Sequence, residues 1–492
     1  MRLAIVWFCA FDLGRPVDPV EGGRKLLQSG IAEAMLSYDD KGDSFVEPRG
    51  IEQETGMLHL MAREDIVLFQ DEYRMNHRFA RLKLRGFDAT ILDVRSKMEV
   101  YLTIHRAGFA ALSFWFSVDK DIKLSDIIIM EDPFSKIKVG KIWEGFLDHI
   151  KRFKMVPAEF IGKIERGEEF DTSISRLHNL YRSFMMSIMQ EMDSKRERKI
   201  RYPFTGIFSA VVIFGVYQLE KFLEDHKKEL HGILAEERMW DWVSESWMEK
   251  AMEKNLAWRE GWAVYIGNAR ALMVVSKEAN DKLRSELKRR FVEGTPDIIA
   301  GIGPAGLLPG LHPPYIIVLD KEKVAEGILE RIWEDQLKGI MLDLTTIIEN
   351  LSLQKIMLES CDYALGEGMP ESIKDLSDIR KQVHEVMEEF LNVRVWRPLT
   401  ATEWVEYGKK AMRINEMYEA IRNRLDLLEG RIRALYDRAF NILILILTII
   451  SGYLQMAEVM FLLGFSGPTA LLIPLLIPVV LLPLAKYFWK II

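Results

Sequence analysis

The stretch AFNILILILTIISGYLQMAEVMFLLGFSGPTALLIPLLIPVVLLPLA, residues 439–485, decides the architecture of this chain. Glu458 is its single charged residue, whereas 28% of the 492 residues are charged. A Gly-Phe-Ser-Gly-Pro sequence at 464–468 divides it into apolar segments at 440–463 and 469–485. A bilayer core about 30 Å thick needs about 20 helical residues, or about 17 at the short end. The sequence therefore predicts a C-terminal two-helix transmembrane hairpin with a basic tail at 439–492. The alternative is a buried hairpin of soluble helices.

The basic residues that flank the two segments indicate their orientation. Arginines precede the first segment, lysines follow the second, and the turn between them has neither. Because lysine and arginine are enriched on the cytoplasmic side of membrane proteins, we expect the N- and C-termini in the cytoplasm and two spans in the cell (inner) membrane. The flanking residues are Arg424, Arg431, Arg433, Arg438, Lys486 and Lys490.

Apolar residues recur in steps of three and four before the first segment, which predicts a coiled-coil seam. No proline interrupts residues 402–463, so we expect one rod of roughly 90 Å at 1.5 Å per residue. It would belong to a helical stalk region at 323–438, with further helices at 323–365 and 372–391. The alternative is a helix packed against its own domain. The seam consists of Tyr418, Ile421, Leu425, Leu428, Ile432, Leu435 and Ala439.

The first 322 residues have the pattern of a cytoplasmic α/β region. Runs rich in β-branched and aromatic residues predict strands at 3–11, 66–70, 79–84, 99–105 and 109–118, and a buried strand at 204–217. Helices are expected at 135–154 and 173–192. A predicted hairpin at 100–118 is echoed at 263–276. This echo suggests two related lobes, residues 1–155 and 156–322, whereas two unrelated hairpins are the alternative.

Composition excludes several classes of protein. A net charge of -7 and a pI of about 5.9 argue against a nucleic-acid partner. Two cysteines, Cys9 and Cys361, make neither a disulfide framework nor a zinc site and fit a reducing cytosol. The mean hydropathy of -0.01 is the average of a charge-rich region and a short apolar one, which excludes a carrier with many spans.

The sequence shows no catalytic arrangement, and we expect no enzyme activity. Residues 301–306 match G-x-G-x-x-G, but the prolines that follow forbid the helix a dinucleotide site needs, so a structural loop is expected. His226 and His231 are five residues apart, a spacing that favours a solvated surface over a metal site. Tryptophans 240, 242, 247, 258 and 262 could line a ligand pocket, although packing is the simpler interpretation.

The first apolar segment carries one constellation of polar and small residues. Helical spacing places them on one stripe, while isoleucine and leucine occupy the rest. Polar groups are costly in lipid, so the stripe should face protein or water. It could line a pore, which requires several chains, or hold packed helices together. The candidate residues are Asn441, Thr448, Ser451, Gly452, Gln455 and Glu458.

In its C-terminal third the chain resembles the CorA-type two-transmembrane magnesium channel superfamily. The resemblance rests on Asn441, the Leu-Thr-Ile-Ile run at 447–450, Gly464 and the basic tail at 486–490. It implies a homopentamer, a cytoplasmic domain that senses ions, and a pore along the first membrane helix. It also implies a divalent cation such as magnesium as transported or regulatory ion. Gly464, Phe465 and Ser466 replace the Gly-Met-Asn signature, which removes the family's carboxamide ring at the outer mouth.

These patterns together lead to two hypotheses. The first is a homo-oligomeric, CorA-like channel or transporter for cations, gated by its cytoplasmic domain. The second is a membrane-anchored ligand sensor or scaffold that does not conduct. In both cases the expected partners are further copies of the chain and the lipid bilayer, and no cofactor is expected beyond the ion.

Overall fold

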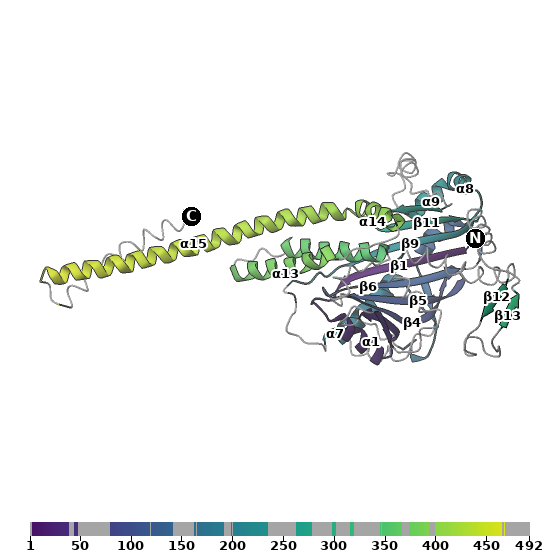
Figure 1. Cartoon of the computed structure of the whole chain (residues 1–492), viewed down its shortest axis with the longest axis horizontal. Coiled ribbons are helices and arrows are strands. Elements are labelled where there is room, and N and C mark those ends of the chain that lie inside the picture. Colours follow the sequence, from purple (N-terminus) through teal and green to yellow (C-terminus); the bar gives the residue numbers. More distant parts are fainter. Residues whose placement is uncertain are drawn as a thin grey trace. The chain divides into compact units, whose positions relative to one another are not determined.

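The computed structural model describes most of the α/β region and one long helix near the C-terminus (Figure 1). The described residues are 2–38, 44–47, 79–118, 120–140, 162–163, 165–190, 198, 200–234, 262–277, 298–301, 315–318, 345, 347–366, 373–392, 399–464 and 467. The expected strand at 66–70, the tryptophans at 240–258 and the second span at 469–485 lie outside them. The chain divides into two units, Met1–Glu367 with Gln382–Ile421, and Gly368–Lys381 with Arg422–Ile492.

An 11-stranded sheet forms the centre of the first unit. Its order is β10-β11-β9-β1-β6-β5-β4-β2-β3, with β7 paired to β4 and β8 paired to β7. All pairs are antiparallel except β9 with β11. The strands are β1 (Arg2–Asp12), β2 (Ala32–Tyr38), β3 (Ser44–Glu47), β4 (Phe79–Ile91), β5 (Val94–His105), β6 (Phe109–Val118), β7 (Ile137–Val139), β8 (Phe170–Thr172), β9 (Thr205–Val216), β10 (Trp262–Ile266) and β11 (Arg270–Ser276). A separate antiparallel pair joins β12 (Ile298–Gly301) to β13 (Tyr315–Val318).

Most strands predicted in the described part of the chain are confirmed. The apolar runs at 3–11, 109–118 and 204–217 become β1, β6 and β9, three neighbours at the centre of the sheet. Both predicted hairpins exist, as β5–β6 and β10–β11. Gly108 turns the first with φ +78°, and a Cβ there would lie 1.7 Å from the Arg15 carbonyl oxygen. Only glycine therefore fits that turn.

The helix predicted at 135–154 is wrong at its start. Residues 137–139 form β7, which joins β4 to β8. Ile137 and Val139 are buried and Lys138 is exposed, the alternation of a strand. The helix predicted at 173–192 is confirmed as α7 (Ile174–Gln190).

The boundary between the two predicted lobes falls at residue 155, outside the described residues. Strands from both sides of it share one sheet, since β1 pairs with β6 on one side and β9 on the other. The hairpins that echo each other therefore belong to a single layer. Their origin by duplication stays a prediction.

Alternating residues of the strands divide the sheet into two faces. The face that carries Ile5, Trp7 and Cys9 is buried in one apolar core with side chains of β4, β5, β6 and β9. We call it the core face. Five helices contribute to or pack against this core. They are α1 (Pro19–Gln28), α4 (Leu124–Glu131), α7, α8 (Leu219–Asp225) and α9 (Lys227–Leu234).

The opposite face of the sheet contacts the helix at residues 347–366. A Cβ on Gly206 of β9 would lie 3.7 Å from Ile356 of that helix. Ala10 and Ala111, which pair across β1 and β6, are fully or almost fully buried on the same face. Small side chains let a helix approach a sheet closely. The helix is itself almost entirely buried from Ile347 to Met357, so the sheet has helices on both faces.

The single rod predicted from residue 402 to 463 is wrong. The structure has two helices, α14 (Leu399–Ala411) and α15 (Ile414–Leu462). Arg413 separates them with a φ of +57°, a left-handed conformation that ends an α-helix. Met412 and Ile414 on either side are buried, which fixes the bend. The 49 residues of α15 then span about 74 Å at 1.5 Å per residue.

The heptad seam of α15 is partly buried within the single chain. Ile421, Leu425, Leu428 and Ile432 are at most 9% exposed. Leu435 is half-buried and Ala439 is exposed. This part of the seam therefore packs against the chain itself, as the alternative interpretation holds, and a coiled coil between chains stays a prediction. The helix predicted at 372–391 is confirmed as α13 (Ile373–Asn392).

Candidate functional site

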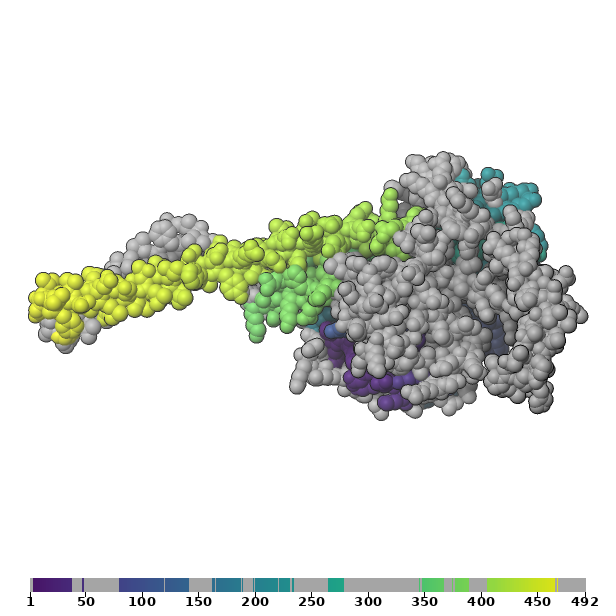
Figure 2. Space-filling model, in the orientation of Figure 1, coloured from purple at the N-terminus to yellow at the C-terminus, as the bar shows by residue number. Residues whose placement is uncertain are grey.

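The part of α15 after residue 439 is apolar on most sides, and the described residues leave most of it exposed. Among the described residues, α15 is the one helix long and apolar enough to cross a membrane, and only 6% of its most apolar window is buried. Figure 2 shows its side chains at the molecular surface along the helix. A helix of this composition that is largely exposed needs a cover such as lipid or partner chains.

The six predicted stripe residues all lie within α15. At 100° per residue they fall within an arc of about 120°. Asn441, Ser451, Gln455 and Glu458 are exposed in the single chain. The hydroxyl of Thr448 donates to the Ile444 carbonyl oxygen at 2.8 Å, so its hydroxyl oxygen is available as an acceptor. The helix thus presents oxygen atoms along one face and hydrocarbon along the others.

Gly464 ends α15 as the sequence predicts. Its φ is +87°, and its N–H donates to the Phe461 carbonyl oxygen at 3.0 Å. A glycine in this conformation closes a helix without the steric cost of a Cβ. The other two outer-turn candidates, Phe465 and Ser466, lie outside the described residues.

A buried carboxylate joins α4 to the core face of the sheet. Glu131, the last residue of α4, is fully buried. Its Oε1 lies 2.6 Å from Nη1 of Arg270, and its Oε2 accepts from the Ser209 hydroxyl at 2.7 Å. Trp7 donates its indole N–H to the Glu131 carbonyl oxygen at 2.7 Å. Arg270, Ser209 and Trp7 are register partners on β11, β9 and β1, so three adjacent strands converge on one residue.

Burial raises the pKa of Glu131 to about 7, while Arg270 and the Ser209 hydrogen bond act in the opposite direction. Desolvation penalises the charged form of a carboxylate more than these partners stabilise it. The cluster is therefore sensitive to protonation near neutral pH.

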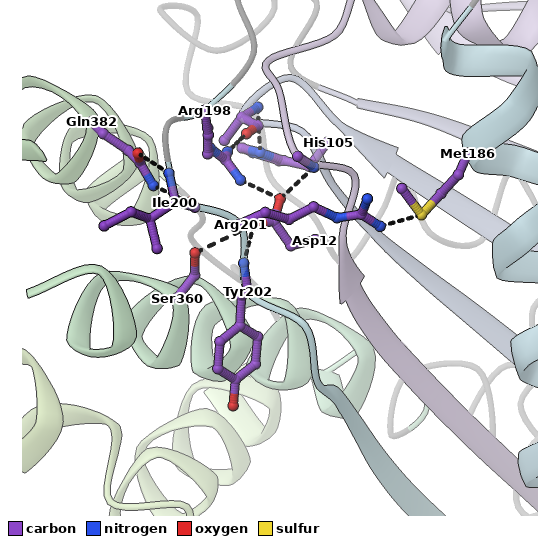
Figure 3. Close-up of polar contacts among 11 residues, drawn as sticks. Asp12, His105, Met186, Arg198, Ile200, Arg201, Tyr202, Ser360 and Gln382 are labelled. Atoms are coloured by element: carbon purple, nitrogen blue, oxygen red, sulfur yellow. Dashed lines mark hydrogen bonds and ion pairs between the residues drawn. The ribbon is translucent and has the colours of Figure 1, made fainter. Parts of the chain in front are cut away.

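A second buried carboxylate, Asp12, holds the end of β1 to two other elements (Figure 3). Its Oδ1 accepts from the Gly14 N–H at 2.7 Å and pairs with Arg198. Its Oδ2 accepts from the Tyr202 N–H at 3.1 Å and from Ser360 Oγ at 3.5 Å. The segment before β9 and the helix at 347–366 are thereby fixed to the centre of the sheet.

The same segment is clamped to α13. Gln382 donates from Nε2 to the Ile200 carbonyl oxygen at 2.7 Å, and its Oε1 accepts from the Ile200 N–H at 3.3 Å. Both bonds appear in Figure 3. The side-chain amide of Gln382 bonds both the N–H and the carbonyl oxygen of Ile200. A residue on a neighbouring β-strand would make the same two hydrogen bonds. The residues before β9 are thus the point where β1, the helix at 347–366 and α13 meet.

A third buried pair links the helix at 347–366 to β4. Nη1 of Arg81 lies 3.4 Å from Oε2 of Glu349, and both side chains are 1% exposed. The guanidinium also lies 5.4 Å from the ring centre of Tyr101. Buried ion pairs of this kind specify a packing arrangement more than they stabilise it.

In the described part of the chain, the remaining candidates from the sequence analysis do not come together in a site. Gly301 ends β12, and the other residues of the G-x-G-x-x-G match lie outside the description. His226 ends α8 and packs on Phe222, with ring centres 4.7 Å apart. Cys9 and Cys361 are buried and unbridged. Within the described residues, no group of three or more His, Cys, Asp and Glu side chains could hold a metal ion.

Sequence reasoning missed the buried carboxylates. Asp12 directly follows the apolar run of β1, and Glu131 directly follows the apolar run Ile127–Met130 of α4. An acidic residue at the end of a buried element was the available signal. The partners could not be found in this way, because Arg270 and Arg198 are more than a hundred residues distant in the chain.

Comparisons with known proteins add no relative. The chain matches no protein-family model, no curated protein and no solved structure.

Proposed function

We propose that this protein is a homo-oligomeric, CorA-like membrane channel or transporter for cations, gated by its α/β region. The observation that carries the proposal is the polar stripe of α15, which lies on one face of a helix that is apolar elsewhere and uncovered by its own chain. The stripe would line a pore on the axis of the oligomer.

Physical chemistry supports this use of the stripe. Amide, hydroxyl and carboxylate groups are costly when they face lipid, so they should face water or another helix. Two spans of one chain cannot enclose a channel, but several copies can place the same residues in rings. Rings of oxygen atoms replace the hydration shell of a cation, and a carboxylate ring at Glu458 would attract it.

The placement in the membrane is part of the same proposal. Residues 440–463 and 469–485 form the two spans, with both termini in the cytoplasm and the tight turn outside. The resemblance to the magnesium channels suggests five copies and a divalent cation such as magnesium. The absence of the Gly-Met-Asn signature suggests that the outer mouth selects ions differently.

The continuity of α15 supports gating by the α/β region. The first two turns of the helix are anchored in the first unit, where Ile414 and Ile421 are at most 1% exposed. The same helix continues without a break to Leu462. A rigid helix transmits rotation or translation along its length, so a movement at its first turn would reach the stripe.

Substitutions on two faces of α15 test the proposal. Glu458→Gln should lower cation flux into liposomes by about tenfold, because it removes the carboxylate ring. Thr448→Val should also lower flux, since it removes a ring of oxygen atoms. Ile450→Val, on the opposite face, is the matched control and should leave flux unchanged. Flux is followed with a cation-sensitive dye for each of several metal ions.

The alternative function, a membrane-anchored sensor or scaffold without conduction, predicts a different set of results. Flux would be absent or equal in all three variants, and the detergent-solubilised protein would be a monomer or dimer. A larger ring together with a selective effect of Glu458→Gln favours the channel. Mass photometry of the same preparations gives the number of chains.

A further inference from the structure

Arg270, the first residue of β11, has an acceptor within reach on each of two helices. Its Nη1 lies 2.6 Å from Oε1 of Glu131 at the end of α4, and it donates to the Ile233 carbonyl oxygen of α9 at 3.4 Å. Both acceptors belong to the last turn of their helices, where the helix dipole favours a cation. The guanidinium can therefore be held by a carboxylate or by a backbone carbonyl.

The two carboxylate oxygens of Glu131 are in different surroundings. Oε2 accepts from the Ser209 hydroxyl at 2.7 Å. Among the described residues, no hydrogen bond is directed at Oε1, although Arg270 lies beside it. The Glu131 side chain is completely buried, whereas 17% of the Arg270 side chain is exposed. Oε1 can therefore take up a proton without loss of the bond to Ser209, and Arg270 is the partner that can turn toward water.

The charges that act on Glu131 in the described part of the chain come from two elements. Arg270 of β11 favours the ionised carboxylate, and Asp132, which caps the end of α4, opposes it. The neighbouring strands β9 and β1 present the Ser209 hydroxyl and the Trp7 indole, which do not titrate near neutral pH. The closest group of α9 is a backbone carbonyl. Burial outweighs these groups and raises the pKa of Glu131 to about 7, so both protonation states are populated near neutral pH.

We infer that Glu131 and Arg270 form a proton-operated switch that acts on the turn between β10 and β11. Ionised Glu131 holds Arg270, and with it the start of β11, against α4. A proton on Oε1 places an O–H donor opposite the N–H donors of Arg270, 2.6 Å away. Two donors do not bond each other, so Arg270 turns to the Ile233 carbonyl oxygen and to water. A change of charge at one pair is the kind of local event that operates a conformational switch.

The turn between β10 and β11 also contacts two further helices. A backbone group of Ile266, the last residue of β10, hydrogen-bonds the side chain of Tyr407 in α14. In the turn itself, Asn268 accepts from Nζ of Lys355, on the helix at 347–366, at 2.7 Å. Release of Arg270 would therefore reach α14, which precedes α15 in the chain. The switch goes beyond the proposed function, because it belongs to the α/β unit and does not require conduction.

Hydrogen exchange of the full chain in detergent tests the inference when it is measured by mass spectrometry at about pH 6 and about pH 8, on either side of the transition. After correction for the intrinsic pH dependence of exchange, wild-type residues 262–276 should be about tenfold less protected at the lower pH, the effect of losing one charge-assisted hydrogen bond. Residues 399–411 of α14 should change with the same midpoint. Glu131→Gln, which is neutral throughout, should show the lower protection at both pH values. Glu168→Gln is the matched control, since Glu168 forms an exposed pair with Arg166, and it should behave like wild type.

Ser209→Ala is a second variant that decides the question even if Glu131→Gln fails to fold. The hydrogen bond from Ser209 lowers the pKa of Glu131, so its loss should move the midpoint of the exchange transition to higher pH. A pair that only supports the fold would not shift this midpoint. Equal corrected protection of wild-type residues 262–276 at both pH values, an unmoved midpoint in Ser209→Ala, or a pH dependence retained in Glu131→Gln overturns the switch. A transition in 262–276 that leaves α14 unchanged overturns its extension to that helix.

Discussion

Two buried carboxylates impose the strongest local constraints on the α/β unit. Glu131 and Asp12 are both fully buried, yet they differ in how their charge is compensated. Asp12 accepts from two backbone N–H groups and pairs with an arginine, so its ionised form is well satisfied. Glu131 pairs with one arginine and accepts from one hydroxyl, and burial has the largest effect on its pKa. The two residues are therefore expected to respond to substitution in different ways.

Glu131 should make stability fall as pH rises toward neutrality. Its pKa is about 7 in the folded chain against a usual value of 4.5, so the folded state holds its proton over a wider range. The contribution of the neutral form is complete below about pH 4.5 and is lost as pH rises through about 7, a change of roughly 3 kcal/mol. In Glu131→Gln this part of the pH dependence should disappear from denaturant unfolding curves. The same slope in wild type and variant would refute the assignment.

Asp12→Asn should destabilise the unit by about 3 kcal/mol or more, because it leaves the charge of Arg198 buried without its partner. Asp88→Asn is the matched control. Asp88 forms an exposed pair with Arg95, and exposed pairs contribute about 1 kcal/mol or less. Thermal unfolding of both variants gives the comparison. Equal losses would show that the Asp12 network does not hold the segment before β9.

At the scale of elements, the junction of α14 and α15 is a break in an otherwise helical stretch. Arg413 adopts a left-handed conformation that residues with a Cβ reach at a cost of about 1 kcal/mol. Its side chain forms an exposed pair with Glu416, which compensates little. The bend is therefore maintained by the buried residues on either side, Met412 and Ile414.

Arg413→Gly should raise the thermal midpoint or leave it unchanged, because glycine adopts this conformation without strain. Arg413→Val should lower stability by about 1–2 kcal/mol, since a β-branched residue is least tolerant of positive φ. Thermal unfolding followed by circular dichroism measures both. A stabilising effect of valine would indicate that the two helices are continuous in solution.

Single helices and strands could be predicted from the sequence, whereas the contacts between them could not. The runs that become β1, β6 and β9 are rich in β-branched and aromatic residues, so local pattern sufficed. The stripe on α15 and the turn at Gly464 likewise follow from helical spacing and from one glycine. The break at Arg413 escaped prediction because arginine is an ordinary helical residue and carries no signal for a left-handed turn.

Long-range register explains the other failures. Trp7, Ser209 and Arg270 meet at Glu131 only because β1, β9 and β11 pair in one particular register. A shift of one residue would turn all three side chains to the other face of the sheet. No local pattern encodes such a register.

For the molecule as a whole, the dominant fact is the contrast between a closely packed α/β unit and an uncovered apolar helix. Both native cysteines lie in the first unit and are buried, and burial raises the pKa of each thiol. Thiols of this kind react slowly. The two native thiols should therefore add little signal when cysteines introduced along α15 are labelled.

Ile450→Cys should be at least roughly tenfold slower to react with a charged maleimide in membranes than Leu427→Cys, because a thiolate does not form in lipid. Leu427 is 72% exposed on the same helix and is the control. Ser451→Cys should react if the stripe faces water. Mass spectrometry of the labelled protein gives the rates. Equal labelling of Ile450→Cys and Leu427→Cys would place this part of the helix in solvent.

The central position of β1 also determines when its two edges can pair during synthesis on the ribosome. Phe8 of β1 pairs with Phe208 of β9. One edge of β1 therefore has no β9 partner until about 200 further residues have been synthesised. At roughly 5–20 residues per second that delay is on the order of ten to forty seconds. During this interval the nascent strands up to β6 present an open, apolar edge, which is the kind of surface that chaperones bind. Every described strand precedes α15 in the chain, so the apolar helix is synthesised only after the described strands of the sheet.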